Sequence, residues 1–331
     1  MHPDPSRRPP VGITMGDAAG VGPEIIARLF AGNPRLPAVV YGDAGIMAAT
    51  LQHLGLNTTL AIRPCPDIES AQLQPGQINV VNRHTPLPPD LPAGQIDARA
   101  GLAAYHYLCH AIDDAQRKAI RAIVTAPLNK EAMQAGGIDY PGHTEILADR
   151  TGTEHYAMML ANTELRVILV TIHIALAQVP TALTLHTELA TIRLAHRACL
   201  QAGIVKPRVA VAGLNPHAGE HGRFGREEID IIEPAIAQAR NEGINASGPW
   251  PGDTIFMRAR RREFDIVVAQ YHDQGLIPVK YMGVDEGVNV TVGLPFVRTS
   301  VDHGTAYDIA GRGIADPRSL QAAFDMALSM T

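Results

Sequence analysis

Three histidines that each follow a short β-branched run predict a metal site. The runs are Val167–Thr171, Val209–Ala212 and Ile266–Ala269, and the histidines that follow them are His173, His217 and His272. Apolar runs of this length, bounded by turn residues, are typical of buried strands in a parallel sheet. Ligands bind such sheets at the carboxyl ends of the strands. Three imidazoles at that edge could bind one divalent metal ion and leave coordination positions open for a substrate.

Each histidine also has an ordinary interpretation. The chain has 14 histidines, and a single one is more often a surface residue or a satisfied core residue. The segments LNPHAGE and YHDQG, however, are rich in small and polar residues, unlike a core. Taken together, the three histidines therefore favour metal binding. His106 and His110 lie one turn apart on an expected helix, but no HExxH pattern surrounds them, so we assign them to its surface.

The elements that must position these side chains indicate an α/β fold. Val11–Met15 and Ile120–Thr125 are expected strands, and Ala98–Lys118 has helical spacing of its apolar residues. Strands that alternate with helices of this length predict a largely parallel sheet flanked by helices. We expect two α/β/α domains with an active site in the cleft between them. Residues 1–125 with 300–331 would form one domain, and residues 126–299 the other.

Composition narrows the class of protein. The chain has 331 residues, of which 46% are hydrophobic and 18% charged, and its net charge is −5. With no long basic run it has no electrostatic basis for binding nucleic acid or anionic membranes. Three scattered cysteines form no CxxC pair, which favours a reducing, cytoplasmic setting. The start MHPDPSRRPP lacks the hydrophobic core of a signal peptide, so none is expected. Polar residues interrupt the apolar stretch Val167–Thr187, so it is not expected to span a membrane.

Two glycine-rich segments could hold a cofactor. Neither GxGxxG after a strand nor GxxxxGK[ST] occurs, so a Rossmann or Walker phosphate loop is not expected. GDAAGVGPE (Gly16–Glu24) lies instead at an expected strand-to-helix turn, where backbone N–H groups can face a ligand. DHGTAYDIAGRGIADP (Asp302–Pro317) lies near the C-terminus. The alternative for each segment is an ordinary tight turn.

These two segments resemble paired motifs of the isopropylmalate and isocitrate dehydrogenase superfamily, GDxxGxGPE and HGTAxDIAGxGIADP. Further motifs resemble those of the 4-hydroxythreonine-4-phosphate dehydrogenase family. They are TAPLNKEA, YPGHTE, TIHIAL, GLNPHAGE, YHDQG, GVNVTVGLPFVRTSVDHGTA and DIAGRG, and they occur in this order over about Val11 to Leu328. As an ordered set they are specific. One departure is Ala18, where family members usually carry proline; it bears on turn rigidity more than on chemistry.

The resemblance assigns roles to matching residues. It implies that one divalent ion, zinc, magnesium or cobalt, is bound near the interface of a homodimer by His173, His217 and His272. It implies substrate contacts from His143, Thr144, Lys280, Asn289 and Arg298. It implies that NAD or NADP is held by the late loop, at His303, Gly304, Thr305, Ala306, Asp308 and Gly311. Lys280 and Arg298 fit their role, since both cations can neutralise a phosphate or carboxylate.

The resemblance implies oxidation of a secondary alcohol beta to a carboxylate, with hydride transfer to NAD(P) and loss of carbon dioxide. The expected substrate is 4-hydroxy-L-threonine 4-phosphate, as in pyridoxal phosphate biosynthesis. Other members of the family act on 4-phospho-D-threonate or 4-phospho-D-erythronate and give dihydroxyacetone phosphate, and others oxidise aromatic cis-dihydrodiol carboxylates. A phosphate acyltransferase and a non-catalytic metal-binding protein are more remote alternatives. The residue that removes the alcohol proton is not assigned.

Overall fold

The computed structural model describes residues 8–88, 90–283 and 287–331, which form two compact units. Unit 1 contains the chain up to Thr153 together with Leu294–Ser329 and Thr331, and unit 2 contains Glu154–Gly293 and Met330. The functional division at residues 125 and 300 stays a prediction. Within the described part of the chain, no helix is both long and apolar enough to cross a membrane.

Unit 1 is built on a parallel sheet. Its strand order is β3-β4-β2-β1-β5-β12, and every pairing between these neighbours is parallel. The central strands are short, β-branched and fully buried, as expected for a sheet covered on both faces. The strands are β1 (Val11–Thr14), β2 (Ala38–Tyr41), β3 (Ala61–Cys65), β4 (Gln77–Val81), β5 (Ala122–Thr125) and β12 (Val297–Val301).

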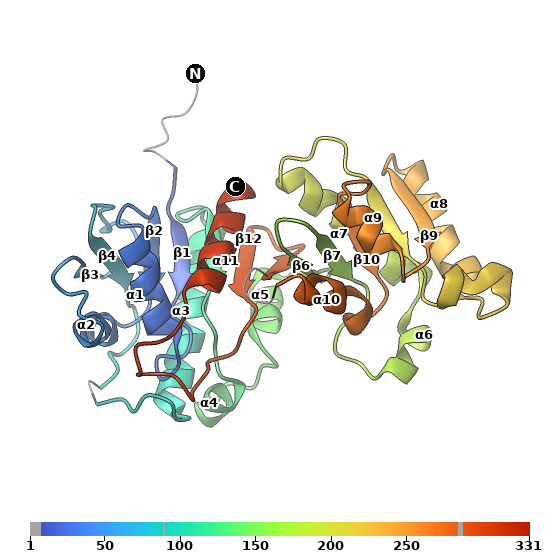
Figure 1. Cartoon of the computed structure of the whole chain (residues 1–331). Helices are drawn as coiled ribbons and strands as arrows, with labels where there is room; N and C mark the ends of the chain where they lie inside the picture. Colours follow the sequence, from blue (N-terminus) through green and yellow to red (C-terminus); the bar gives the residue numbers. More distant parts are fainter. Residues whose placement is uncertain (1–7, 89, 284–286) are drawn as a thin grey trace, which may run out of the picture. The chain divides into compact units, whose positions relative to one another are not determined.

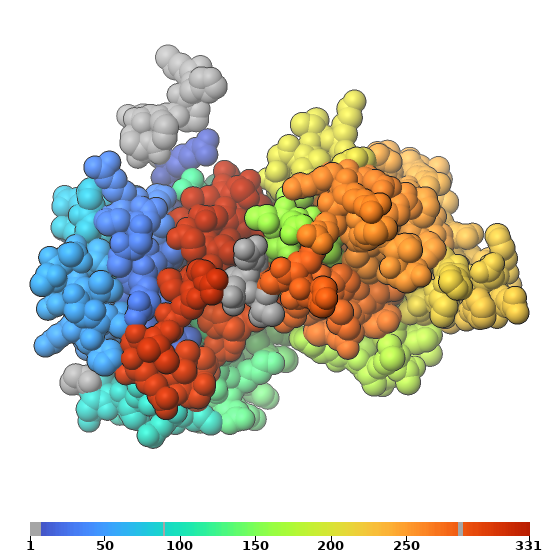
Figure 2. All heavy atoms as spheres, viewed as in Figure 1, coloured from blue at the N-terminus to red at the C-terminus, as the bar shows by residue number. Residues whose placement is uncertain are grey.

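The helices of unit 1 begin at residues that can cap them. Asp43, Asp97 and Asn129 each accept a backbone N–H of the first turn that follows. The first and last helices of the chain pack against each other (Figure 1), and Figure 2 shows the red C-terminal residues against the blue N-terminal ones. The helices are α1 (Gly22–Gly32), α2 (Ala44–His53), α3 (Ala98–Gln116), α4 (Lys130–Ala135), α5 (His143–Thr151) and α11 (Arg318–Ser329).

Unit 2 contains a mixed sheet with the order β11-β6-β7-β10-β8-β9. Strand β6 pairs antiparallel with both its neighbours, while β7, β10, β8 and β9 are parallel. The prediction of a largely parallel α/β fold is therefore confirmed. The strands are β6 (Ala157–Ala161), β7 (Arg166–Leu169), β8 (Val209–Ala212), β9 (Ala246–Trp250), β10 (Ile266–Ala269) and β11 (Val288–Val292).

Irregular helical turns accompany the α-helices of unit 2. A 3-10 segment spans Pro216–Gly222, and a π-helical turn, Glu228–Ile232, leads directly into α8. A shorter 3-10 turn, Leu176–Gln178, precedes α6. The α-helices are α6 (Val179–Ala182), α7 (Leu185–Gln201), α8 (Glu233–Asn241), α9 (Ile255–Arg260) and α10 (His272–Tyr281).

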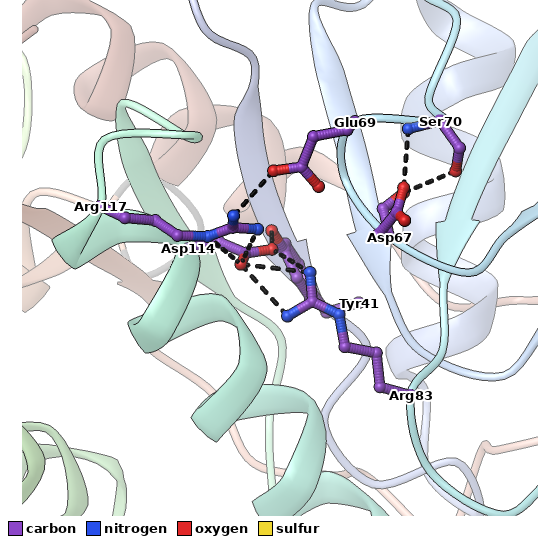
Figure 3. Close-up of polar contacts among 7 residues, drawn as sticks. All are labelled: Tyr41, Asp67, Glu69, Ser70, Arg83, Asp114 and Arg117. Carbon is purple, nitrogen blue, oxygen red and sulfur yellow. Dashed lines mark hydrogen bonds and ion pairs between the residues drawn. The ribbon is translucent and has the colours of Figure 1, made fainter.

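A buried carboxylate ties three elements of unit 1 together (Figure 3). Asp114 on α3 has no exposed surface, and it accepts a hydrogen bond of 2.7 Å from the hydroxyl of Tyr41 on β2. Arg83, after β4, and Arg117, after α3, form ion pairs with it at 3.0 and 2.7 Å. Two cations and a phenol satisfy the charge, as a buried carboxylate requires. The network fixes helix α3 to the strand ends that carry the loops of this unit.

Candidate functional site

The three predicted metal histidines follow three adjacent parallel strands of unit 2. Strand β10 pairs with β7 on one side and with β8 on the other. His173 lies just beyond β7, His217 beyond β8, and His272 is the first residue of α10 after β10. Parallel strands end at the same edge of a sheet, so the three side chains share that edge, as the sequence predicted.

His173 and His272 are neighbours with a separation that suits a shared metal ion. Their ring centroids lie 5.7 Å apart and the planes are inclined at 43°. Two imidazoles on one zinc ion, with zinc–nitrogen distances of about 2.1 Å, have ring centres roughly 5 Å apart. Nδ1 of His272 lies 2.7 Å from Oδ1 of Asp273, which leaves Nε2 as the outward nitrogen. A carboxylate on the far nitrogen is one of the common partners of a metal-binding imidazole.

His217 occupies an unusual backbone segment. His217, Ala218, Glu220 and His221 all have φ between 45° and 55°, with Gly219 at 79° among them. A left-handed conformation disfavours side chains by about 1–2 kcal/mol for each residue, so neighbouring contacts must hold this turn. Asn215 before it donates to Glu228 from its backbone N–H at 2.7 Å and from its side-chain amide at 2.9 Å.

The structure does not bring all three histidines within coordination distance. Across residues 8–88, 90–283 and 287–331, no three histidine, cysteine or acidic side chains form a group that could hold an ion. His217 does line a cavity of about 790 Å³ together with Tyr271 and Asp273, the two neighbours of His272. The donor set therefore fits a divalent ion in its chemistry, with two histidines close together and the third on a cavity next to them.

A buried glutamate behind this edge was missed by sequence reasoning. Glu188 on α7 has no exposed surface and accepts a hydrogen bond of 3.1 Å from the amide of Gln270, at the end of β10. Burial raises the pKa of Glu188 to about 7. The same amide donates to the carbonyl of Ala212 at 2.9 Å. Gln270 thus joins the ends of β8 and β10 to Glu188.

Unit 1 contains a buried cation at the predicted substrate site. Arg298 on β12 is 3% exposed, and its Nη2 donates to Oγ1 of Thr125 on β5 at 2.8 Å. Burial lowers the pKa of Arg298 to about 10, and the charge of Glu145 acts in the opposite direction. Burial also holds the pKa of His143 well below its ordinary value, with a further contribution from the positive charge of Arg298. His143 is therefore neutral beside a charged guanidinium.

His143 and Thr144 begin helix α5, whose N-terminus can attract an anion. The preceding residue, Gly142, provides no side-chain cap for the helix. The first backbone N–H groups of α5 have no partner within the helix, and the helix dipole favours negative charge at this end. The helix N-terminus, neutral His143 and cationic Arg298 all belong to unit 1. Together they suit a phosphate or carboxylate group.

The other two predicted substrate residues belong to unit 2. Lys280 is in the last turn of α10. Asn289 lies on β11, with its amide nitrogen 3.3 Å from the sulfur of Met158 and its Oδ1 buried without a hydrogen-bond partner. An unsatisfied buried amide oxygen is consistent with a ligand-binding role.

The two glycine-rich segments meet within unit 1. The hydroxyl of Tyr307 donates to Asp17 at 2.6 Å, and the backbone N–H of Gly311 donates to Glu24 at 2.6 Å. Gly20 lies so near Thr305 that an added Cβ would come within 2.9 Å of it. Both segments were predicted from the sequence as possible cofactor sites, but the pairing of acidic residues in the first with the second was not.

A cavity of about 200 Å³ borders these segments. Among the predicted cofactor residues Gly311 lines it, beside Gly20 and Glu24 of the first segment. His303, Gly304 and Asp308 are exposed, Ala306 is partly exposed, and Thr305 is buried beneath Gly20. Ligand pockets usually span about 300–1,000 Å³, so this cavity has room for one part of a dinucleotide.

Comparison with known proteins gives a consistent result over nearly the whole chain. The family described as "Pyridoxal phosphate biosynthetic protein PdxA" matches residues 35–327. A 4-hydroxythreonine-4-phosphate dehydrogenase of Beijerinckia indica is 55% identical over 320 residues, which cover 96% of this chain and 94% of the relative. A D-threonate 4-phosphate dehydrogenase of Salmonella typhimurium is 45% identical over 97% of this chain and 98% of its own length.

A solved structure agrees with these relatives. The crystal structure of 4-hydroxythreonine-4-phosphate dehydrogenase from Klebsiella pneumoniae matches with a TM-score of 0.89 at 43% identity. The match covers 97% of this chain and 99% of that protein.

The raised pKa of Glu188 predicts a pH-dependent stability. Its ordinary pKa is 4.5, and in the folded protein it is about 7. Between these values the unfolded chain releases a proton that the folded protein retains, so stability falls as the pH rises from about 4.5 through 7. The loss is on the order of 3 kcal/mol. Glu188→Gln should remove this fall, as measured by urea unfolding across that range. Glu154→Gln, at an exposed site, should keep the wild-type profile, and parallel profiles for all three proteins would contradict the prediction.

Proposed function

Because the chain belongs to the pyridoxal phosphate biosynthetic protein PdxA family, we propose that it is a metal- and NAD(P)-dependent dehydrogenase of a 4-phosphorylated 3-hydroxy acid. The proposed substrate is 4-hydroxy-L-threonine 4-phosphate, which is oxidised at its 3-hydroxyl and then loses carbon dioxide. The observation that carries this proposal is buried Arg298 with neutral His143 at the N-terminus of α5.

Arg298 is proposed to bind the substrate phosphate. A guanidinium buried to 3% exposure is less stable in its charged form than one in water, as its lowered pKa reflects. A phosphate dianion would offset that loss and could accept two parallel hydrogen bonds from it. His143 and Thr144 would add directional hydrogen bonds, with the backbone N–H groups of α5 beside them. Lys280 and Asn289 are proposed as the further substrate contacts.

His173, His217 and His272 are proposed to hold one divalent ion, zinc, magnesium or cobalt. The spacing of His173 and His272, and the cavity that His217 shares with the neighbours of His272, support this assignment. When bound, such an ion supplies Lewis acidity that favours the deprotonated form of a substrate hydroxyl. Asp273 would orient the ring of His272 for binding.

NAD or NADP is proposed to lie against the late glycine-rich loop, at His303, Gly304, Thr305, Ala306, Asp308 and Gly311. The hydrogen bonds from Tyr307 to Asp17 and from Gly311 to Glu24 support a preformed surface there. When bound there, the cofactor would supply a hydride acceptor. The role of the chain is to fix the distance between that acceptor and the carbon that is oxidised.

A homodimer in the cytoplasm is proposed as the working form. Exposed apolar side chains that follow His173 and His272 closely in the sequence support contact with a second copy here, since exposed apolar surface is typical of interaction sites. They include Leu176 at 66%, Ile277 at 62% and Tyr281 at 92% exposure. The three cysteines are unpaired and buried, in keeping with a reducing compartment.

The second candidate substrate is 4-phospho-D-threonate or 4-phospho-D-erythronate. The similarity to the Salmonella D-threonate 4-phosphate dehydrogenase, at 45% identity, favours this alternative. Both candidates have a phosphate for Arg298, and they differ in stereochemistry and in the substituent beside the carboxylate. Rates of nicotinamide reduction, measured side by side with each acid, distinguish them.

The phosphate assignment predicts a selective defect in an arginine variant. Arg298→Ala should raise KM for the 4-phospho acid about a hundredfold or more, since the loss of a desolvated bidentate contact is worth several kcal/mol. KM for the same acid without its phosphate should change little. Arg298→Lys retains the positive charge but lacks the planar guanidinium. Its KM for the 4-phospho acid should lie between those of the wild type and Arg298→Ala. Equal losses for both acids would show that Arg298 does not recognise phosphate and would favour an unphosphorylated substrate.

The metal assignment predicts that one histidine of the left-handed turn matters and another does not. His217→Ala should lower bound divalent metal, measured by elemental analysis, well below one ion per subunit, and abolish turnover. His221→Ala is the matched control, because His221 has the same backbone conformation and is also exposed. Metal retained in a variant with alanine at His173, His217 and His272 would refute the site.

A further inference from the structure

Unit 2 has a second cavity lined by cations, outside the residues assigned to substrate, metal or cofactor. Its volume is about 440 Å³, within the usual range of about 300–1,000 Å³ for ligand pockets. Its lining side chains come from α7, from the segment before β6 and from the end of α8. They are His155, His186, Ala190, Arg193, His196, Arg197, Glu242 and Ile244.

Helix α7 supplies one continuous cationic face to this cavity. His186, Ala190, Arg193 and Arg197 recur at intervals of four, three and four residues, which place them on one side of a helix. Like charges at i and i+4, as in Arg193 and Arg197, destabilise an isolated helix. The small side chain of Ala190 lies between His186 and the two arginines. This cationic stripe occurs in a chain whose net charge is −5.

One carboxylate borders the cavity, and it is already engaged. Glu242 accepts hydrogen bonds from Nε and Nη2 of Arg193 at 2.7 and 2.5 Å. This pair holds Arg193 in place and uses two of its five N–H donors. Arg197 is exposed, and the described residues give it no ion pair. The two arginines and Glu242 together therefore leave the cavity with a net positive charge.

The imidazoles add donors that suit an anion. Nδ1 of His196 is buried without a hydrogen-bond partner, although buried polar atoms are usually satisfied. His155 and His186 pack edge to face with their centroids 5.3 Å apart. Guanidinium groups repel a metal cation, and within the described residues no three donors form a metal-binding group. A cavity of about 440 Å³ also suits a small molecule better than a nucleic acid strand.

We propose that this cavity is a second anion-binding site, which takes a small phosphate-bearing ligand and is separate from the substrate site in unit 1. Arg193 and Arg197 bind the phosphate, and His155, His186 and His196 add hydrogen bonds. The ligand is either free phosphate or a phosphorylated metabolite. In a family whose named relatives act on phosphorylated acids, such a site would let a phosphorylated metabolite influence the enzyme without competing at Arg298.

Hydrogen exchange and calorimetry test this site on the full chain. The probes are inorganic phosphate and 3-phosphoglycerate at low ionic strength and a single, near-neutral pH. Binding should slow exchange in α7 and near residues 155 and 242–244. Tighter binding of 3-phosphoglycerate would indicate a phosphorylated metabolite, and equal or weaker binding would indicate free phosphate; both are forms of the proposed site.

Two variants and one control make the test specific. Ala190→Leu places a bulkier apolar side chain in the cavity without a change in charge and should sharply reduce the protection of α7. Arg197→Gln should weaken binding about fivefold, as expected for the loss of one partly exposed charge interaction. Arg261→Gln removes an exposed arginine of the same unit outside the cavity and should leave binding unchanged. Protection confined to unit 1 would overturn the proposal, and so would wild-type affinity in both Ala190→Leu and Arg197→Gln. Protection of α7 by zinc and not by phosphate would also overturn it.

Discussion

A positive charge buried inside unit 1 is the constraint on which the proposed chemistry depends. Arg298 is placed there by β12, whose parallel pairing with β5 brings Thr125 within hydrogen-bond distance. Burial lowers the pKa of Arg298, yet at about 10 it remains charged near neutral pH. That charge helps to keep His143 neutral at the start of α5. The substrate phosphate can then be bound by a cation, a neutral imidazole and a helix N-terminus that exist before the substrate arrives.

At the sheet edge in unit 2, the histidines are positioned by strand pairing and by hydrogen bonds behind the strand ends. Parallel pairing of β7, β10 and β8 delivers three histidines to one edge, and the backbone beyond each strand determines how closely they approach. Gln270 joins two of these strand ends to buried Glu188, and Asn215 joins the left-handed turn to Glu228. Neutral and acidic hydrogen-bond partners thus support the loops that carry the histidines. In this account the positions of the proposed ligands depend on these contacts behind them.

Much of this arrangement could be predicted from the sequence, because hydrophobic runs and the polar residues after them are local signals. The strands before His173, His217 and His272, and the parallel sheet, follow from such runs. The contact of Arg298 with Thr125 could not be predicted, because it depends on which strands are neighbours. Glu188 lies within a helix and resembles a surface residue until the buried face is known.

Two further features of the structure were not predicted from the sequence, and each has a physical reason. The left-handed turn at His217 departs from ordinary residue preferences, since side chains other than glycine rarely adopt that conformation. The cationic face of α7, in contrast, is visible in the spacing of its histidine and arginines. That spacing alone does not indicate a site, because basic residues on one side of a helix are equally typical of a solvent-exposed face.

The titration of His143 tests most directly whether Arg298 is charged in the free protein and binds the anion of the substrate. Nitrogen-15 NMR of the labelled imidazoles, with His143→Gln to assign the signal, measures its pKa in the free protein and with a phosphorylated acid bound. The account predicts a pKa well below the ordinary 6.5 in the free protein, and a rise when a dianion offsets the charge of Arg298. An ordinary pKa that does not change on binding would contradict the account.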